Sequence, residues 1–371
     1  MAVCVKMNAV VPSISEAVIV SPISAAPLGA PVIVNPLEQS NWDAQLAALP
    51  EATLFHGAGW ARVLRDTYGH QPVYFCRYAG GQLRQALPVM EVSSPLTGRR
   101  GVSLPFADFC SPLNGGTEDL RDLYAFAMEH GRRQNWRYFE ARGSFNRWAG
   151  ATASVSFFGH AIHLGGDSGM FREMDGAMRR GIRKAEQAKV QVEFGTNTGA
   201  MREFFALHRY SRRRHGLPPQ PVEFFDNIAR HIFERGHGFV AIARHEGRAL
   251  AAAVFFHAGH FGLYKFGASD YQFQHLRPNN LLMWEAIKHC AALGLTDLHL
   301  GRTSLFNDGL RHFKLGFGAV EETIQYAKYD FRRSGFVSDV DRSEGPLNAM
   351  FRCLPLPLLT QAGRFLYPHL S

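Results

Sequence analysis

The stretch of sequence that decides the fold runs from Gly267 to Phe317 and reads GASDYQFQHLRPNNLLMWEAIKHCAALGLTDLHLGRTSLFNDGLRHFKLGF. Apolar side chains recur along its middle at spacings of three and four residues, which is the period of one helix face. These side chains are Met283, Ala286, Ile287 and Cys290. The stretch therefore predicts a strand end, a loop, a helix, a buried strand over residues 295–300, a second loop and a short helix.

Both ends of this helix carry local signals. Pro278 fits an entry turn, and Asn279 or Asn280 is expected to cap the first turn. Gly294 stands where a helix commonly ends in a left-handed residue. The preceding loop therefore leads into a helix N-terminus, whose free N–H groups favour a phosphate or a carboxylate. Arg277 adds a positive charge there, although many loops of this kind bind nothing.

Length and composition indicate two folded domains. The chain has 371 residues, of which 46% are hydrophobic, enough for two packed cores. The net charge of +8 favours an anionic partner, such as a nucleotide donor, tRNA, an acidic glycan or a membrane surface, whereas nothing points to DNA. No apolar run of about 18 residues predicts a membrane-spanning helix. The five scattered cysteines show no metal-binding spacing, so we expect a reducing, cytoplasmic compartment and no bound metal.

The order of predicted elements divides the chain into four parts. Residues 1–30 are small, apolar and dotted with proline, which predicts a disordered leader. Two domains follow, over residues 31–165 and residues 166–335. Residues 336–371 form a tail whose prolines interrupt any long helix. The tail is apolar with few charges, so it either packs on the second domain or lies on a membrane surface.

The two predicted domains echo each other. The first runs hairpin, loop, helix and strand, and ends in Glu140-Ala141-Arg142 followed by Ser144. The second repeats that order and ends in Gly301-Arg302-Thr303 followed by Ser304. The matching order of elements favours a duplicated fold over coincidence. The fold class is therefore α/β (α+β), with a mixed, mostly antiparallel sheet flanked by helices in each copy.

This arrangement resembles the GNAT acyltransferase fold, and two such domains in tandem resemble the Fem-type (FemAB-like) group, the peptidoglycan-bridge aminoacyltransferases and their acyltransferase relatives. The resemblance spans roughly residues 40–371. The motifs that carry it include Tyr68-Gly69-His70-Gln71-Pro72, Leu104-Pro105-Phe106-Ala107-Asp108, Arg277-Pro278-Asn279, Gly301-Arg302-Thr303 and Phe313-Lys314. The tail, with Leu354-Pro355-Leu356-Pro357, is similar to members found with exopolysaccharide and exosortase-type loci.

One departure from the resemblance leaves the donor open. Acetyl-CoA-dependent members of the fold carry a glycine pair in the loop over the pyrophosphate. The corresponding loop here, residues 274–280, reads QHLRPNN and has no glycine. The resemblance therefore implies one of three donors: an acyl-CoA, an acyl-carrier protein or an aminoacyl-tRNA.

Two residues are the predicted catalytic pair. The resemblance places Lys314 where Fem-type enzymes stabilise the oxyanion or the donor. The alternative without a function is a surface lysine beside a core phenylalanine. Asp108 lies in a proline-bracketed loop, where its carboxylate would accept a proton from the acceptor amine or bind its ammonium form. The alternative for Asp108 is a turn-capping role.

The remaining site residues are predicted in two groups. The donor-binding residues are Arg277, Asn279, Asn280, Arg302 and Phe313. The acceptor-binding residues are Arg179, Arg180, Arg183, Lys184 and Tyr264. An internal ion pair is the alternative for Arg302. A solvated basic helix face is the alternative for the residues 179–184.

The resemblance implies an N-acyltransferase that moves an acyl or aminoacyl group to an amine of a cell-envelope or exopolysaccharide precursor. The acceptor is expected to be glycan or peptidoglycan-like, and the protein cytoplasmic, with contact at the inner face of the membrane as a further expectation. A non-catalytic GNAT-like pair that binds a polysaccharide-assembly partner is the alternative, favoured by the missing glycines. RNA binding rests on the charge alone.

Overall fold

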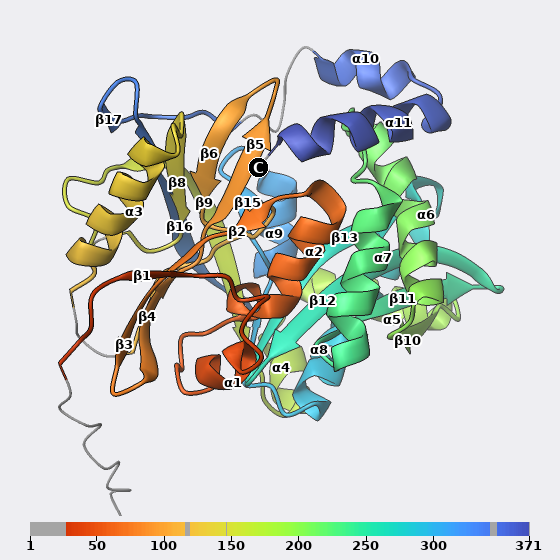
Figure 1. The fold of residues 1–371 in the computed structure, drawn as a ribbon. Helices are drawn as coiled ribbons and strands as arrows, with labels where there is room; N and C mark the ends of the chain where they lie inside the picture. The colour runs from red at the N-terminus through yellow and green to blue at the C-terminus, as the bar shows by residue number, and fades with distance from the viewer. Residues whose placement is uncertain (1–26, 116–118, 146, 342–346, 371) are drawn as a thin grey trace, which may run out of the picture.

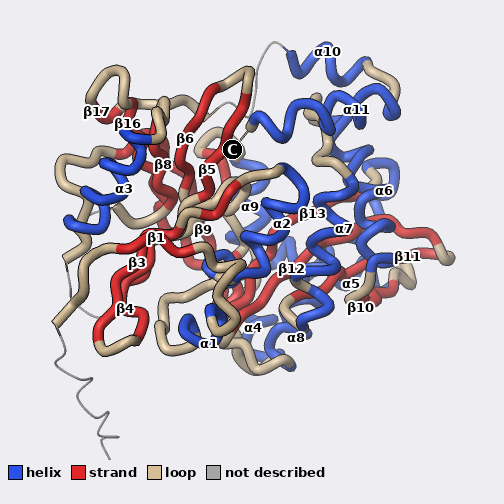
Figure 2. Tube along the Cα trace, viewed as in Figure 1, coloured by secondary structure: helices blue, strands red, loops and turns tan. Residues whose placement is uncertain are grey.

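The computed structural model describes residues 27–115, 119–145, 147–341 and 347–370. Most of the predicted leader lies outside these residues. Strands from the beginning, middle and end of the chain form one large sheet (Figures 1 and 2). Within the described residues this sheet has 13 strands.

The long sheet runs across the whole molecule. Its strands, in spatial order, are β10 (Gln191–Gly195), β11 (Gly238–His245), β12 (Arg248–Ala258), β13 (Phe261–Ser269), β14 (Asp297–His299), β9 (Ala153–His163), β16 (Val320–Asp330), β8 (Tyr138–Arg142), β6 (Gly98–Val102), β5 (Met90–Ser94) and β2 (Gln71–Pro72). Two short strands lie off this path, β15 (Thr303–Ser304) on β9 and β17 (Gly335–Phe336) on β16.

The two halves of the chain exchange strands at the centre of this sheet. Strand β9 pairs with β14 on one side and with β16 on the other. Strand β16 then pairs with β8, so a strand from the end of the chain completes the sheet of the first half. The sheet therefore runs through the predicted boundary near residue 166. The division into two domains at that boundary stays a prediction.

A second sheet belongs to the first half alone. It contains β1 (Val32–Val34), β3 (Tyr74–Ala79), β4 (Gln82–Leu87) and β7 (Leu113–Asn114). The predicted hairpin is confirmed as β3 and β4. Its return strand ends at Leu87 because Pro88 cannot donate a ladder hydrogen bond, and the chain continues into β5 of the large sheet.

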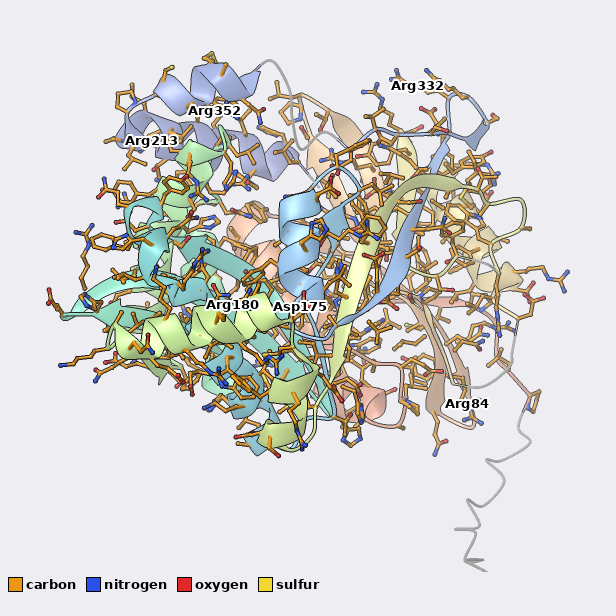
Figure 3. All side chains as sticks on the ribbon, turned by 180° about the vertical axis from the view of Figure 1, so that it is seen from behind. Arg84, Asp175, Arg180, Arg213, Arg332 and Arg352 are labelled. Atoms are coloured by element: carbon orange, nitrogen blue, oxygen red, sulfur yellow. The ribbon has the colours of Figure 1, made fainter. Side chains whose placement is uncertain are left out.

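Helices cover both faces of the sheet in the second half. One face packs against α5 (Gly176–Gln187) and α8 (Pro278–Ala292), the other against α6 (Thr198–Arg214) and α7 (Val222–His231). Helices α6 and α7 lie in front in Figure 1, and α5 lies in front in the reverse view of Figure 3. The mixed α/β class predicted from the sequence is confirmed. The remaining helices are α1 (Trp42–Leu46), α2 (Ala58–Tyr68), α3 (Arg121–Arg133), α4 (Asp167–Glu173) and α9 (Asp308–Leu315), with short 3-10 turns η1 (Leu54–His56), η2 (Phe233–Arg235) and η3 (Tyr271–Leu276).

The helix at the centre of the deciding stretch is confirmed, but its cap is not the predicted one. Helix α8 begins at Pro278, and Arg277 is its N-cap residue with φ of 57°. Proline suits the first helical position because its missing N–H has no partner there. Asn279 and Asn280 therefore lie inside the helix, whereas Gly294 takes the expected left-handed conformation at its end.

The tail folds into two helices that connect both halves. Helices α10 (Leu347–Cys353) and α11 (Leu356–Leu366) lie over α6 (Figure 1), and the turn η4 (Tyr367–His369) follows. The Tyr367 hydroxyl donates to the carbonyl of Pro218, next to α6. The His369 carbonyl accepts from Arg100 on β6 at 2.8 Å. Among the described residues, no helix is both long and apolar enough to cross a membrane.

Candidate functional site

The loop before Asp108 is held in an unusual conformation at the end of β6. Leu104 and Phe106 both have positive φ, 53° and 62°, a backbone conformation that residues other than glycine rarely adopt. The Ser103 hydroxyl and the Arg142 guanidinium hold the loop through its carbonyl groups. Backbone strain of this kind persists where the surroundings enforce it, and it is common at functional sites.

Lys265 reaches Asp108 because the strand that carries it is bulged. On β12, Val254 lies opposite Phe266 and the next residue lies opposite Tyr264, so Lys265 is the extra residue of a β-bulge. Bulges re-aim side chains next to active sites. The Lys265 ammonium lies 2.8 Å from Asp108 Oδ2, with the two side chains 5% and 11% exposed.

Asp108 lies where two parallel strands separate. The pairing between β13 and β14 ends at Leu263 and His299. Just beyond that point, a Cβ on Gly301 would lie 3.1 Å from the Tyr264 carbonyl and 3.6 Å from Asp108 Oδ2. A loop from the first half of the chain therefore brings its carboxylate to the gap between two strands of the second half.

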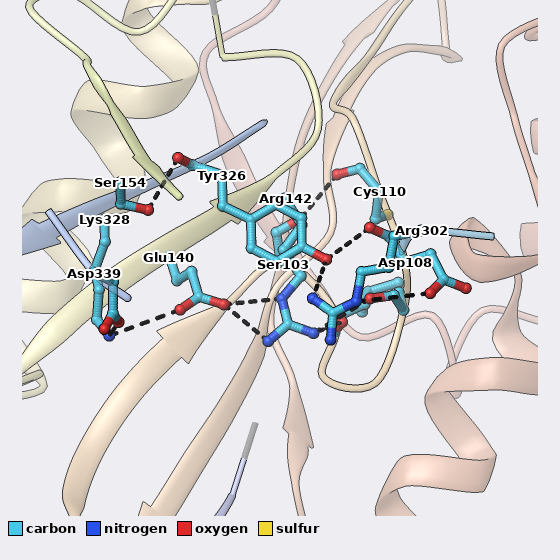
Figure 4. Close-up of polar contacts among 12 residues, drawn as sticks. Ser103, Asp108, Cys110, Glu140, Arg142, Ser154, Arg302, Tyr326, Lys328 and Asp339 are labelled. Carbon is cyan, nitrogen blue, oxygen red and sulfur yellow. Dashed lines mark hydrogen bonds and ion pairs between the residues drawn. The ribbon is translucent and has the colours of Figure 1, made fainter. Parts of the chain in front are cut away.

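Arg302 and Tyr326 complete the polar side of this gap (Figure 4). The Arg302 guanidinium lies 3.9 Å from Asp108 Oδ1 and donates to the Tyr326 hydroxyl at 2.8 Å. The same hydroxyl donates to the Asp108 backbone carbonyl at 2.7 Å. Tyr326 lies on β16, so the strand exchange of the fold places it here.

Lys314 lies on the inner side of α9 and is 2% exposed. Its ammonium donates to the carbonyls of Gly301 and Arg302, at 2.8 and 3.2 Å. Burial lowers the pKa of Lys314 to about 8, and the attraction of Asp108 opposes that shift. A lysine with this pKa exchanges its proton near neutral pH, unlike an exposed lysine.

We call Asp108, Lys265, Arg302, Lys314 and Tyr326 the seam cluster, because it joins the two halves. Burial alone would raise the pKa of Asp108, but Lys265, Arg302 and Lys314 outweigh it and hold that pKa below its usual value. Burial also lowers the pKa of Lys265, against the pull of Asp108. When its three basic side chains are protonated, the cluster carries three positive charges and one negative charge, so it favours developing negative charge.

Three of the predicted site residues thus meet in one place: Asp108, Lys314 and Arg302. The other predicted donor residues lie elsewhere on the second half. Arg277 is exposed at the start of α8, Asn279 is half-buried, and Asn280 packs against α5 through Met178. Phe313, next to Lys314 on α9, packs on Phe317 and on the core under α5 and α8.

The predicted acceptor residues do not join the seam cluster. Residues 179, 180, 183 and 184 lie on α5, where Arg180, Arg183 and Lys184 are exposed and Arg180 is seen from behind the molecule (Figure 3). Tyr264 packs its ring on Phe255 within the core under that helix. Burial raises the pKa of Tyr264 to about 12. A role for this set in acceptor binding stays a prediction.

Sequence reasoning missed Lys265 and Tyr326. A signal for Lys265 was present, because it interrupts the apolar strand residues Leu263 to Phe266 with a charge that must find a partner when buried. Tyr326 gives no such signal, since tyrosine is common in strands. Among the described residues, no group of three or more His, Cys, Asp or Glu side chains is placed to hold a metal ion.

Comparison with known proteins shows which fold this chain resembles. Residues 172–315 match the family model of the acetyltransferase (GNAT) domain. The crystal structure of FemX is similar with a TM-score of 0.63 and 14% identity, covering 80% of this chain and 97% of FemX. A tandem GNAT protein from the clavulanic acid biosynthesis pathway is similar with a TM-score of 0.53 and 12% identity, covering 82% and 98% of the two chains.

A third similar structure is described as the C-terminal domain of a lysylphosphatidylglycerol synthetase from Agrobacterium fabrum. Its TM-score is 0.52 at 14% identity, covering 79% of this chain and 92% of that one. No curated protein matches the sequence. At these identities the likenesses show the fold, which is a Fem-like tandem GNAT fold. Together with the family match, this fold supports an acyltransferase as the general class.

Proposed function

We propose that this protein transfers an acyl or aminoacyl group to an amine of a cell-envelope or exopolysaccharide precursor. The observation that carries the proposal is the excess of positive charge at the seam cluster, whose three basic side chains all come from the residues that match the acetyltransferase family. A thioester or ester carbonyl becomes negatively charged as an amine attacks it. Charged donors held in place around that oxygen lower the barrier to attack.

The proposed step joins the amine nitrogen to the carbonyl carbon and breaks the bond to the donor's sulfur or oxygen. Lys265 or the remaining N–H of Lys314 stabilises the oxyanion. The amine loses its proton as the leaving group gains one, and Lys314, with its pKa of about 8, is suited to relay that proton. Asp108 has a lowered pKa and is thereby a weak base, so we assign it to holding Lys265 in position.

The donor is proposed to lie along the unpaired edge of β13, with its phosphates toward the start of α8. Arg277 and the first N–H groups of that helix would hold an anion. Gly267, on the same strand, is exposed, and the Tyr264 hydroxyl lies directly against it. The donor is an acyl-CoA, an acyl-carrier protein or an aminoacyl-tRNA. The exposed α5 charges would face a glycan or peptidoglycan-type acceptor, and Tyr264 lies beneath them.

The tail supports the proposal of a cytoplasmic protein that works at the inner face of the membrane. Met350, Leu358 and Phe365 are exposed on α10 and α11, at 51%, 58% and 63%. The tail helices and the turn after them, residues 347–370, contain no acidic residue, and Arg352 is exposed on the same side of the molecule as Arg213 of α6 (Figure 3). Exposed apolar residues next to arginine favour an anionic membrane surface.

The proposed function is tested by measuring transfer and donor binding together. Purified protein is combined with acetyl-CoA, a long-chain acyl-CoA, or charged and uncharged tRNA, and its thermal unfolding is recorded. A donor at about 100 times its dissociation constant adds roughly 2.7 kcal/mol of stability. We expect one donor class to stabilise the protein and to acylate an amino-sugar acceptor, with transfer lost in Lys314→Met but kept in the exposed-lysine control Lys189→Met.

The same experiment separates the main alternative. A protein that binds no donor and transfers nothing would be a non-catalytic binding partner in polysaccharide assembly, which the glycine-free loop before α8 favours. Stabilisation only by charged tRNA would assign the aminoacyl branch. Loss of transfer in both lysine variants would contradict a specific role for Lys314.

A further inference from the structure

A cavity of about 700 Å³ lies between the two halves, on the side of the sheet that carries α7. Its wall is formed by α1 and η1 from the first half and by the end of α7 and the turn between β12 and β13 from the second. Most of this wall is apolar, and Leu46, Leu49 and Ile232 are among the buried residues that form it. The volume lies within the usual range for small-molecule sites.

The charged or titratable residues that line this seam cavity are Asp43, Arg235, Asp297, His231, His237 and His260, none of which is buried. Asp43 and Arg235 line it with exposed side chains that lie 3.8 Å apart. Thr53 is an internal polar group, and its amide and hydroxyl both bond to His56. A polar rim around an apolar interior suits a ligand that is itself apolar along most of its length.

The apolar wall continues from the cavity toward the seam cluster. Leu54 and Phe261 line both the cavity and a void of about 10 Å³ behind it, which Phe55 and Leu263 also line. Lys265, of the seam cluster, lies over the ring of Phe55, 5.6 Å from its centre. The lining between the cavity and the lysine is therefore mostly apolar, with Thr53 and His257 as its polar members.

We propose that the seam cavity binds the hydrocarbon chain of a long-chain acyl donor. The proposal rests on the proposed function, because it needs the donor's carbonyl at the seam cluster. Phe261 and Lys265 are four strand residues apart, about 13 Å at the rise of a strand. An acetyl group placed at Lys265 would not reach the cavity, whereas a long acyl chain spans that distance and fills it.

The cavity is tested first by direct binding, without catalysis. The probe is 11-(dansylamino)undecanoic acid, whose fluorescence rises in an apolar site, with palmitoyl-CoA and acetyl-CoA as competitors. Ala47 and Ala258 line the cavity from the two halves, so Ala47→Trp and Ala258→Trp would fill it. Ala48 is exposed and adjacent to Ala47, so Ala48→Trp is the matched control. Circular dichroism establishes that each variant is folded.

We expect the probe to bind, palmitoyl-CoA to displace it and acetyl-CoA not to. Both cavity-filling variants should weaken probe binding at least tenfold, and Ala48→Trp should leave it unchanged. Absence of binding, or equal binding by all folded variants, would overturn the proposal. Probe binding that appears only after residues 1–26 are removed would assign the cavity to the chain's own N-terminal segment and overturn it as well.

Transfer assays separate this inference from the proposed function. Lys265→Met should abolish transfer and leave binding of the probe unchanged. Ala47→Trp should lower transfer from a palmitoyl donor and spare transfer from an acetyl donor. If Ala47→Trp left transfer from every donor unchanged, the assignment of the cavity to the acyl chain would be refuted and the proposed function would stand. Probe binding without transfer from any donor would refute the proposed function, and with it the assignment of the cavity to a donor.

Discussion

Arg142 and Arg302 stand at matching positions in the two halves, and they differ in how their charge is neutralised. Both lie against the ring of Tyr326, 5.2 and 5.5 Å from its centre. Arg142 is 5% exposed and pairs at 2.8 Å with Glu140 on its own strand. Arg302 is 39% exposed, and the carboxylate it faces lies 3.9 Å away, on Asp108 of the other half.

The difference lies in how far the charge around each arginine is balanced. Arg142 pairs with Glu140, and the neighbouring Lys328 lies near Glu140 and pairs with Asp339, so two basic and two acidic side chains balance there. Arg302 shares Asp108 with Lys265 and Lys314, so the second copy keeps an excess of positive charge. Two equivalent arginines thus serve a structural role in one half and, in our proposal, a reactive role in the other.

The largest effect is expected from removing the carboxylate that pairs with each arginine, on Asp108 or on Glu140. Breaking a buried pair costs about 3–5 kcal/mol because the partner charge remains buried. Asp108→Asn and Glu140→Gln should therefore each lower the free energy of unfolding by roughly this amount, measured in urea. Transfer should be lost in Asp108→Asn and retained in folded Glu140→Gln. Equal loss of transfer in both would erase the distinction between the two halves.

Replacing the arginines themselves should give opposite results. Arg142→Met leaves Glu140 buried without its partner, so we expect about 3 kcal/mol less stability and little change in transfer. Arg302→Met removes a partly exposed charge, so stability should fall by only about 1 kcal/mol. Transfer should fall at least tenfold, which corresponds to about 1.4 kcal/mol of barrier. Urea unfolding and initial rates check both; a stability loss in Arg302→Met as large as that in Arg142→Met would contradict the comparison.

The lowered pKa of Lys314 predicts a pH dependence. Between pH 8 and 10.5 the unfolded chain keeps the Lys314 proton while the folded chain has lost it. The free energy of unfolding attributable to this group therefore rises with pH through that window, by at most about 1.4 kcal/mol per pH unit. Urea titrations of the native protein and Lys314→Met should differ by this slope. Parallel pH profiles of the two proteins would show that Lys314 has an ordinary pKa.

The smallest effect is expected from Tyr326→Phe. The ring that separates the two arginines remains, but the hydroxyl bonds to Arg302 and to the Asp108 carbonyl are lost. We expect about 1 kcal/mol less stability. Transfer should fall a few-fold, in the same direction as in Arg302→Met, because the hydroxyl bonds to Arg302 and to the loop that carries Asp108. An unchanged rate would remove Tyr326 from the seam cluster's function.

Local pattern predicted the elements well and their pairing poorly. Spacing identified α8, because amphipathic periods are properties of neighbouring residues. The exchange of β9 and β16 was not predicted, since it pairs residues more than 150 positions apart: Tyr326 lies opposite Val155. The cap of α8 was wrong because proline at the first helical position displaced both asparagines inward.

The site was predicted in part for the same reason. Asp108, Arg302 and Lys314 lie in motifs that the resemblance carries, and the structure brings them together. Lys265 depends on a bulge, and Tyr326 depends on the exchange of strands between halves. Neither feature leaves a periodic trace in the sequence. The role of each predicted residue stays a prediction until the variants above are measured.

The position of β16 also bears on how the chain is made. It is translated about 180 residues after β8, whose edge it covers along Arg142 to Tyr138. Domains usually fold as they leave the ribosome, from the N-terminus onward. Here β8 stays uncovered, and prone to pair with other chains, until residues 320–330 have left the ribosome. We expect ribosome-stalled chains that end before residue 320 to need a chaperone.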